Sequence, residues 1–130
     1  YKNGYNLIEA FTEMGFLTTH ILDSAHGCPA AGVRVELYRI SDSEAALVLE
    51  AVTNADGRCD EPLLEDADFS VGTYELRFHI GDYFAAKGID LPSPAFLDVV
   101  PLRFGIAEPE DHYHVPLLVS PYSYSTYRGS

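Results

Sequence analysis

The clearest pattern in the chain is an alternation of apolar and polar side chains. Tyr74, Leu76, Phe78 and Ile80 are separated from one another by single polar or charged residues, and residues 33–38 alternate in a similar way. Because successive side chains of a β-strand point to opposite faces, a period of two is typical of half-buried strands. Both stretches are therefore predicted to be strands with one face in the core.

Shorter runs bounded by Gly, Pro, Asn or Asp predict further strands. These runs cover residues 16–23, 45–53, 99–106 and 112–120. The one helical candidate is the stretch 82–87, which follows Gly81 and is closed by Gly88, a residue suited to stop a helix. Regularly spaced short strands with turn signals predict an all-β fold, a sandwich of two sheets with one short helix.

Length and composition fit one globular domain. The chain has 130 residues, of which 47% are hydrophobic, so one core can carry the fold without a disulfide or a structural metal. Residues 1–13 are less regular than the rest. We expect a leader or linker there and the folded domain over residues 14–130.

The net charge argues against two classes of partner. Eight Lys and Arg residues face 20 Asp and Glu residues, which gives a net charge of −12. Such a field repels the phosphates of nucleic acids and the anionic surfaces of membranes. No apolar run approaches the roughly 18 residues of a membrane-spanning helix. We therefore expect neither a nucleic-acid partner nor a membrane partner.

The cysteines give an indication of the compartment. Cys28 and Cys59 have neither the spacing of a metal or redox pair nor the density of a secreted disulfide scaffold. Two free thiols favour a reducing compartment, and we expect the cytoplasm, with the periplasm and the peroxisome left open.

Three histidines are candidates for chemistry. His20 shares a strand face with Thr18 and Leu22, while His112 and His114 share one face of the last long strand. A His-x-His pair could donate two nitrogens to zinc. No third ligand is indicated nearby, so two outward histidines without a metal are the favoured interpretation, and a metalloprotein is the alternative.

Arg58 follows the turn signature Asn-Ala-Asp-Gly at residues 54–57, which could lift its guanidinium above the sheet as a fork for planar oxygens. The acidic residues after it do not form an EF-hand. Placing Gly57 at the sixth loop position puts Val52 first and Leu63 last, and neither is a calcium ligand. Nucleophile elbows, phosphate-binding glycine loops and dinucleotide fingerprints are missing from the sequence.

Together these residues resemble the transthyretin-like 5-hydroxyisourate hydrolases. The resemblance spans most of the chain and is carried by residues 17–23, 26–33, 53–59, 112–118 and 120–130. The final Tyr-Arg-Gly-Ser at residues 127–130 matches the family's signature tetrapeptide and is its most specific feature.

The resemblance implies a prealbumin (transthyretin)-like sandwich over residues 14–130. It also implies a homotetramer, a dimer of dimers with sites at the dimer–dimer interface. The implied reaction is hydrolysis of 5-hydroxyisourate to 2-oxo-4-hydroxy-4-carboxy-5-ureidoimidazoline, a step of urate degradation to allantoin in purine catabolism. No cofactor is expected.

The resemblance also assigns site residues. They are His20, Arg58 and His114 as catalytic residues, and Tyr127, Arg128, Gly129 and Ser130 as substrate-binding residues. Imidazoles suit acid and base roles because an unperturbed one titrates near pH 6.5. The sequence leaves open which histidine is the base.

A transthyretin-type carrier of small aromatic ligands is the second interpretation. It shares the fold and the stretch Ser-Pro-Tyr-Ser-Tyr-Ser-Thr at residues 120–126. Transthyretins typically carry other residues at positions matching His20, Arg58 and His114, and they lack the tetrapeptide. The resemblance therefore favours the enzyme.

Overall fold

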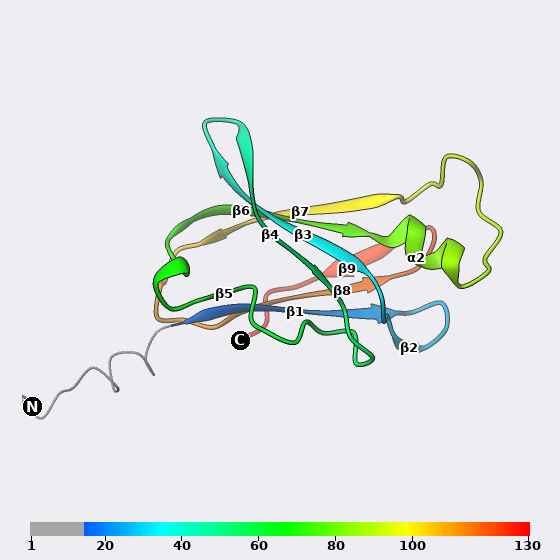
Figure 1. Ribbon diagram of the computed structural model, residues 1–130, viewed down its shortest axis with the longest axis horizontal. Helices are drawn as coiled ribbons and strands as arrows, with labels where there is room; N and C mark the ends of the chain where they lie inside the picture. The colour runs from blue at the N-terminus through cyan, green and yellow to red at the C-terminus, as the bar shows by residue number, and fades with distance from the viewer. Residues whose placement is uncertain (1–14) are drawn as a thin grey trace, which may run out of the picture.

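Two β-sheets pack face to face in the part of the chain that the computed structural model describes, residues 15–130 (Figure 1). The expected leader or linker at residues 1–13 lies outside the described residues. The strands are β1 (Phe16–Asp23), β2 (Cys28–Pro29), β3 (Arg34–Ser41), β4 (Glu44–Val52), β5 (Leu64–Glu65), β6 (Gly72–His79), β7 (Val99–Ile106), β8 (Tyr113–Val119) and β9 (Tyr124–Thr126). One sheet has the order β2-β1-β8-β9, with β5 also paired to β1, and the other has the order β4-β3-β6-β7.

The predicted alternation is confirmed in the core between the sheets. In β1, Leu17 and Ile21 are fully buried while the residues between them are half-exposed or polar. In β6, Tyr74, Leu76 and Phe78 are buried in the same way. Each such side chain contributes about 1.5–3 kcal/mol through the apolar surface that it removes from water. The two-sheet sandwich predicted from the sequence is therefore correct.

The helix begins earlier than predicted. It is α2 (Ile80–Ala86), whereas the sequence indicated 82–87 and placed Ile80 in a strand. The reason is a distant contact: the N–H groups of Ile80 and Gly81 both donate to the carbonyl oxygen of Asp98, at 3.0 and 2.9 Å. Because this carbonyl accepts hydrogen bonds from the first N–H groups of the helix, the helix can begin directly after β6. Gly88 follows the helix with φ +83°, as expected of a terminating glycine.

A short 3₁₀ helix, Asp66–Asp68, follows β5. Of the helices within residues 15–130, none has the length and hydrophobicity needed to cross a lipid bilayer.

The pair β1–β8 positions the candidate site. It is parallel, with Thr18 opposite His114 and His20 opposite Pro116. Since alternate residues of a strand share a face, Thr18, His20 and His114 all lie on the outer face of this sheet. Two residues that are 94 positions apart, His20 and His114, thus become neighbours.

The sequence did not predict three short strands, β2, β5 and β9. Each has only two or three residues and forms by pairing with a longer strand, β2 and β5 with β1 and β9 with β8. All three residues of β9 are exposed, so it carries no alternating pattern that sequence analysis could detect.

Candidate active site

A closed turn presents Arg58 to the sheet. The side-chain oxygen of Asn54 accepts hydrogen bonds from the N–H groups of Asp56 and Arg58, at 2.9 and 3.2 Å. The backbone N–H of Asn54 donates to the carbonyl of Arg58 at 2.7 Å, and the N–H of Gly57 donates to the carbonyl of Asn54 at 2.9 Å. Asn54 therefore organises the turn from inside, as an Asx residue does.

This turn is docked on β1. The carbonyl of Gly57 accepts a hydrogen bond from the N–H of Ile21 at 2.8 Å, and the backbone of Arg58 forms an isolated antiparallel bridge with His20. Gly57 has φ +76°, and a Cβ added to it would lie 2.4 Å from the carbonyl oxygen of Ile21. Only glycine fits both the conformation and the contact. The sequence motif thus places Arg58 beside His20, as the resemblance implied.

The same turn orients the ring of His20. Its Nε2 atom is 2.9 Å from the backbone carbonyl oxygen of Asp56. A carbonyl oxygen only accepts hydrogen bonds, so Nε2 carries a hydrogen and donates it. Nδ1 has no hydrogen-bond partner among residues 15–130, and it is the nitrogen that His20 can offer to water or a ligand.

His114 is held on both sides. Its Nδ1 atom lies 2.9 Å from the hydroxyl oxygen of Thr18. Its backbone N–H and C=O both bond to Gly129, at 3.3 and 2.7 Å. Burial lowers the pKa of His114 below its ordinary value, and electrostatic interactions with Arg58 and His20 lower it further. The ring is therefore neutral near pH 7 and able to accept a proton.

The last residues of the chain contact two different parts of the molecule. Gly129 lies against His114, where an added Cβ would be 3.1 Å from the Cβ and Cδ2 atoms of the histidine. The guanidinium of Arg128 turns elsewhere: it lies 4.2 Å from the ring centre of Tyr113, donates to the carbonyl of His112 at 3.3 Å and pairs with Asp111 at 3.6 Å. These contacts fasten the tail to β8.

Tyr127 and Arg128 line a cavity whose walls do not include His114. This cavity, of about 460 Å³, lies between β7 and the end of the β8–β9 pair, with Phe104 and Val115 on its walls. The structure thus brings His20, Arg58, His114 and Gly129 together, with Ser130 next in the chain. The side chains of Tyr127 and Arg128 are not part of this group. Their substrate-binding role stays a prediction.

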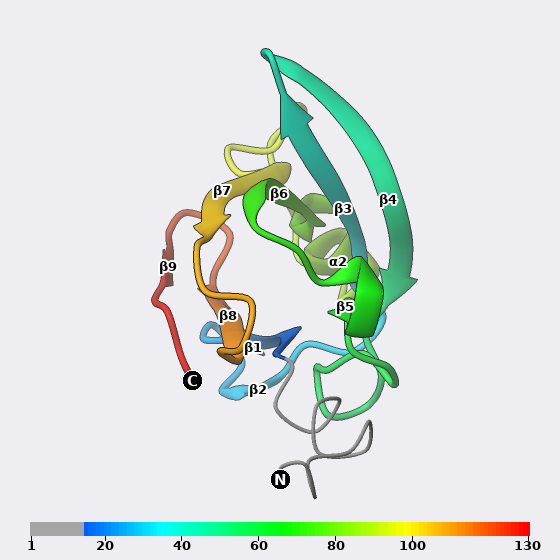
Figure 2. The ribbon, with the colours of Figure 1, turned by 90° about the vertical axis from the view of Figure 1, so that its left-hand side faces the viewer.

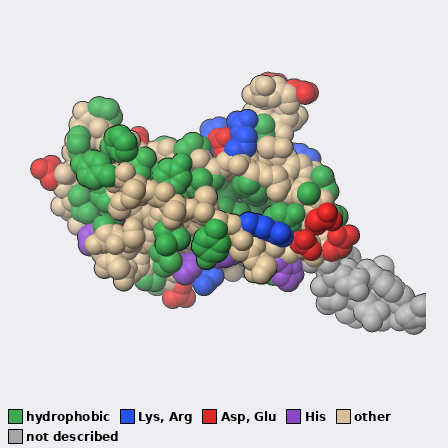
Figure 3. Space-filling view, turned by 180° about the vertical axis from the view of Figure 1, so that it is seen from behind, with side chains coloured by type: hydrophobic (Ala, Val, Ile, Leu, Met, Phe, Trp, Pro, Cys, Tyr) green, Lys and Arg blue, Asp and Glu red, His purple; other side chains and the backbone are tan. Residues whose placement is uncertain are grey.

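The outer face of the sheet β2-β1-β8-β9 is rich in histidine. In Figure 3, histidine side chains reach the surface along the lower side of the molecule, with a basic side chain beside them. The ring of His112 packs against that of Phe16, with ring centres 3.9 Å apart. Within the described part of the chain, no group of three His, Cys, Asp or Glu side chains is arranged to hold a metal ion.

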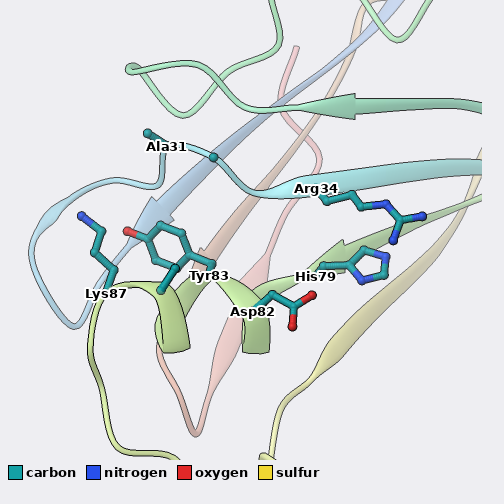
Figure 4. A pocket seen from close by; sticks show the side chains of 8 residues that line it. Ala31, Arg34, His79, Asp82, Tyr83 and Lys87 are labelled. Atoms are coloured by element: carbon teal, nitrogen blue, oxygen red, sulfur yellow. The ribbon is translucent and has the colours of Figure 1, made fainter.

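A further cavity, of about 390 Å³, lies beside α2 and is lined by none of the site residues assigned from the sequence. Figure 4 shows Arg34 and His79 at one end of it, with Tyr83 and Lys87 at the other. His79 donates to Glu36 at 2.7 Å, and Arg34 pairs with Glu36 and with Glu50 on β4. Its basic groups on the strands are already neutralised by carboxylates, which makes it a poorer candidate for a site.

Sequence reasoning missed two groups that orient the histidines. Thr18 was placed on the correct face, but its pairing with His114 depends on the register of β1 and β8. Asp56 acts through its backbone carbonyl, so its side-chain type gives no signal. The turn signature at 54–57 and the family resemblance, which assigns Arg58 to the site, were the indications that this segment approaches it.

The family model described as HIUase/Transthyretin family matches residues 17–129. The chain belongs to the HIUase/Transthyretin family. A curated family member, 5-hydroxyisourate hydrolase of Pseudomonas aeruginosa, is 62% identical over 117 residues, which are 90% of this chain and 93% of that protein.

Three solved structures show how family membership extends to the fold. The crystal structure of (S)-allantoin synthase matches with a TM-score of 0.85 and 56% identity; the match covers 90% of this chain and 44% of that longer one. The 5-hydroxyisourate hydrolase of Klebsiella pneumoniae matches with a TM-score of 0.74 and 38% identity, over 90% of this chain and 100% of that one. Sea bream transthyretin in complex with thyroxine matches with a TM-score of 0.77 and 30% identity, over 87% and 93%.

Proposed function

We propose that this chain is a hydrolase that opens the ring of 5-hydroxyisourate to give 2-oxo-4-hydroxy-4-carboxy-5-ureidoimidazoline. The observation that carries the proposal is the group of His20, Arg58 and His114 on one sheet face, with an open nitrogen on each ring. The high identity to a curated 5-hydroxyisourate hydrolase supports the substrate. The reaction needs only water and the chain's own organic groups.

His114 is the proton acceptor. Its lowered pKa keeps the ring neutral, and Nε2 is the nitrogen without a hydrogen-bond partner in residues 15–130. As a water oxygen attacks the amide carbonyl carbon, one water proton passes to Nε2. His20 orients that water by accepting a hydrogen bond at Nδ1.

Arg58 stabilises the charge that then develops on the carbonyl oxygen. A guanidinium is a planar fork of donors that suits a flat heterocycle and its oxyanion. When the tetrahedral intermediate collapses, the ring C–N bond breaks and the leaving nitrogen takes the proton from His114. One water has been added across the bond, the ring nitrogen has gained one hydrogen, and the carbonyl has become a carboxylic acid.

The tail completes the site. Gly129 holds His114 through two backbone hydrogen bonds, and Ser130 is the next residue of the chain. Ser130 provides a hydroxyl to the substrate or water. Tyr127 and Arg128 are the other proposed substrate-binding residues, and Arg128 also holds the tail against the start of β8.

We propose further that the active form is a homotetramer, a dimer of dimers. Within residues 15–130, β7 pairs only with β6 and β9 pairs only with β8, and Figure 2 shows both strands on the same side of the sandwich. An unpaired edge is a template for another strand, so a second copy can extend both sheets. The outer face that carries His20 and His114 is then left to form an enclosed site between two such dimers. Light scattering of active protein at monomer mass would contradict this arrangement.

The cytoplasm is the proposed compartment. Both cysteines are unpaired and half-buried, and burial together with the charge of Asp60 raises the pKa of the Cys59 thiol. Two free thiols suit a reducing environment. Localising a tagged chain in its own cells tests this.

The deciding experiment is a spectroscopic assay with 5-hydroxyisourate generated freshly by urate oxidation. The expected result is decay of the substrate absorbance far faster than the spontaneous rate, in proportion to protein concentration. Decay at the spontaneous rate would contradict the proposal. It would favour a transthyretin-type carrier, which the match to the thyroxine complex of sea bream transthyretin suggests as the second function, and which ligand-binding calorimetry with a small aromatic compound would then test.

A further inference from the structure

The hydroxyl of Thr18 lies beside the inner nitrogen of His114. Its Oγ1 atom is 2.9 Å from Nδ1, and the two residues are direct partners in the parallel pairing of β1 and β8. A change of register would move every side chain of a strand to the other face, so the sheet fixes this contact. The hydroxyl has no other hydrogen-bond partner among residues 15–130.

A neutral imidazole has one N–H and one lone pair, and the hydrogen bond made by one nitrogen determines what the other can do. If Nδ1 carries the hydrogen, Nε2 has the lone pair and can accept a proton. If Nε2 carries the hydrogen, the ring can only donate from its open side. The chemistry of His114 therefore depends on how Nδ1 is bound.

We propose that Thr18 is a positioning residue that keeps the hydrogen of His114 on Nδ1, because its Oγ1 accepts a hydrogen bond from Nδ1–H. Nε2 then carries the lone pair that takes a proton from water. The kinetic consequence rests on the proposed hydrolase function. The position of the hydrogen does not, because it is a property of the free protein.

The surroundings of the ring support this assignment. Arg58 lies close enough for its positive charge to affect the ring of His114. A cation attracts a lone pair and repels an N–H, so it favours the lone pair on the open nitrogen. Gly129 limits the alternative in which the ring rotates away from Thr18, because its backbone is bonded to that of His114 and packs close to the ring.

Three variants separate this role from a structural one. Thr18→Val keeps the branched shape and strand propensity but removes the hydroxyl, and Thr18→Ser restores it. Thr73→Val makes the same chemical change at an exposed position on β6, in the other sheet, and serves as the matched control. The readouts are the ¹⁵N chemical shifts of His114 at neutral pH in the free protein, followed by kcat and KM for 5-hydroxyisourate.

We expect the wild-type spectrum to show the hydrogen on Nδ1, and Thr18→Val to show a mixture of both forms. Loss of one neutral hydrogen bond should lower kcat about tenfold and leave KM within about twofold. Thr18→Ser should recover the wild-type spectrum and most of kcat, and Thr73→Val should change neither.

Two spectroscopic results would overturn the proposal: a wild-type ring with its hydrogen on Nε2, or a Thr18→Val protein whose His114 spectrum equals that of the wild type. If the wild type fails to hydrolyse 5-hydroxyisourate, the proposed function fails, and the spectra alone still decide the role of Thr18. A Thr18→Val protein with a changed spectrum but unchanged kcat would also overturn it, because the hydrogen position would then have no catalytic consequence.

Discussion

On the outer face of the sheet β4-β3-β6-β7, the basic side chains are matched with carboxylates. His79 donates to Glu36 at 2.7 Å, and Arg34 pairs with the same carboxylate and with Glu50. Next to them, Glu75 receives hydrogen bonds from two further arginines. The hydrogen bond from His79 holds the pKa of Glu36 below its ordinary value despite burial, with help from Tyr38 and Arg34.

The outer face of the other sheet carries the same residue types without carboxylate partners. Among residues 15–130, neither His20 nor Arg58 nor His114 forms an ion pair, although the chain has 20 acidic residues to supply one. Their partners are a backbone carbonyl and a hydroxyl, which orient the rings without neutralising a charge. The difference shows which face stabilises the fold and which is available to a ligand.

The largest effect should come from removing the unpaired groups. His20→Ala, Arg58→Ala and His114→Ala should each lower turnover by about a hundredfold or more, the contribution of one acid–base or oxyanion group. His79→Ala, on the other face, should leave turnover within about twofold. Steady-state kinetics on folded variants checks this. Similar losses on both faces would remove the distinction between them.

Deletion of residues 127–130 should lower turnover about tenfold or more while the melting temperature changes little. The deletion releases the backbone of His114 from Gly129, but it removes no residue of the buried core. Deletion of Ser130 alone is the matched comparison and shows how much of the loss belongs to its hydroxyl. A truncated protein with the parental rate would show that the tail has no catalytic role.

The paired face should respond in stability instead. Glu36→Gln should lower the free energy of unfolding by about 1–2 kcal/mol at pH 7, since it weakens charge-assisted hydrogen bonds at a largely buried carboxylate. A carboxyl with a lowered pKa stabilises the fold above the ordinary pKa of 4.5, and this contribution disappears as the pH falls through the folded-state pKa. The variant should therefore lose less stability than the wild type between pH 5 and pH 3 in urea denaturation. Parallel curves for the two proteins over this range would contradict the assignment.

The pH dependence of turnover should distinguish the causes that act on His114. Because its pKa is lowered, kcat/KM should stay level through neutrality and fall only at acidic pH, where the ring gains a proton. Burial is the largest cause, and the charge of Arg58 is the next. Arg58→Gln should therefore move the acidic limb of the residual activity to higher pH. A limb that stays in place or moves to lower pH would show that Arg58 does not act on this ring.

Metal removal is the change from which we expect no effect on turnover. Dialysis against a chelator should leave turnover unchanged, because every proposed group is organic. Activity that is lost and then restored by zinc would support the metalloprotein interpretation of His112 and His114.

The long strands could be predicted because each one shows an alternation of apolar and polar residues in the sequence itself. Leu17 and Ile21 alternate with polar residues in the sequence, and they face the core in the structure. The start of α2 could not be predicted from a local pattern, since it depends on hydrogen bonds to the distant carbonyl of Asp98. The same holds for β9, whose exposed residues are ordered by β8.

The candidate site could be predicted only in part for a similar reason. His20, Arg58 and His114 were assigned through the resemblance to the family, and the structure places them together. His79 and Arg34 are the same residue types, and their pairing with carboxylates, Glu36 for both and Glu50 for Arg34, separates them from the site. Thr18 and the carbonyl of Asp56 depend on register and on a docked turn, which a linear pattern does not contain.

The parallel pair β1–β8 has a consequence for how activity appears during folding. Thr18 and His114 are 96 positions apart, so closing this contact joins nearly the two ends of the described chain. Contacts of such long range cost the most loop entropy and form slowly compared with hairpins such as β3–β4. A partly folded chain that has its hairpins but lacks this pair would have much of its secondary structure and no assembled site. In a refolding experiment, recovery of hydrolysis would therefore lag behind the circular dichroism signal and report the joining of the first and last long strands.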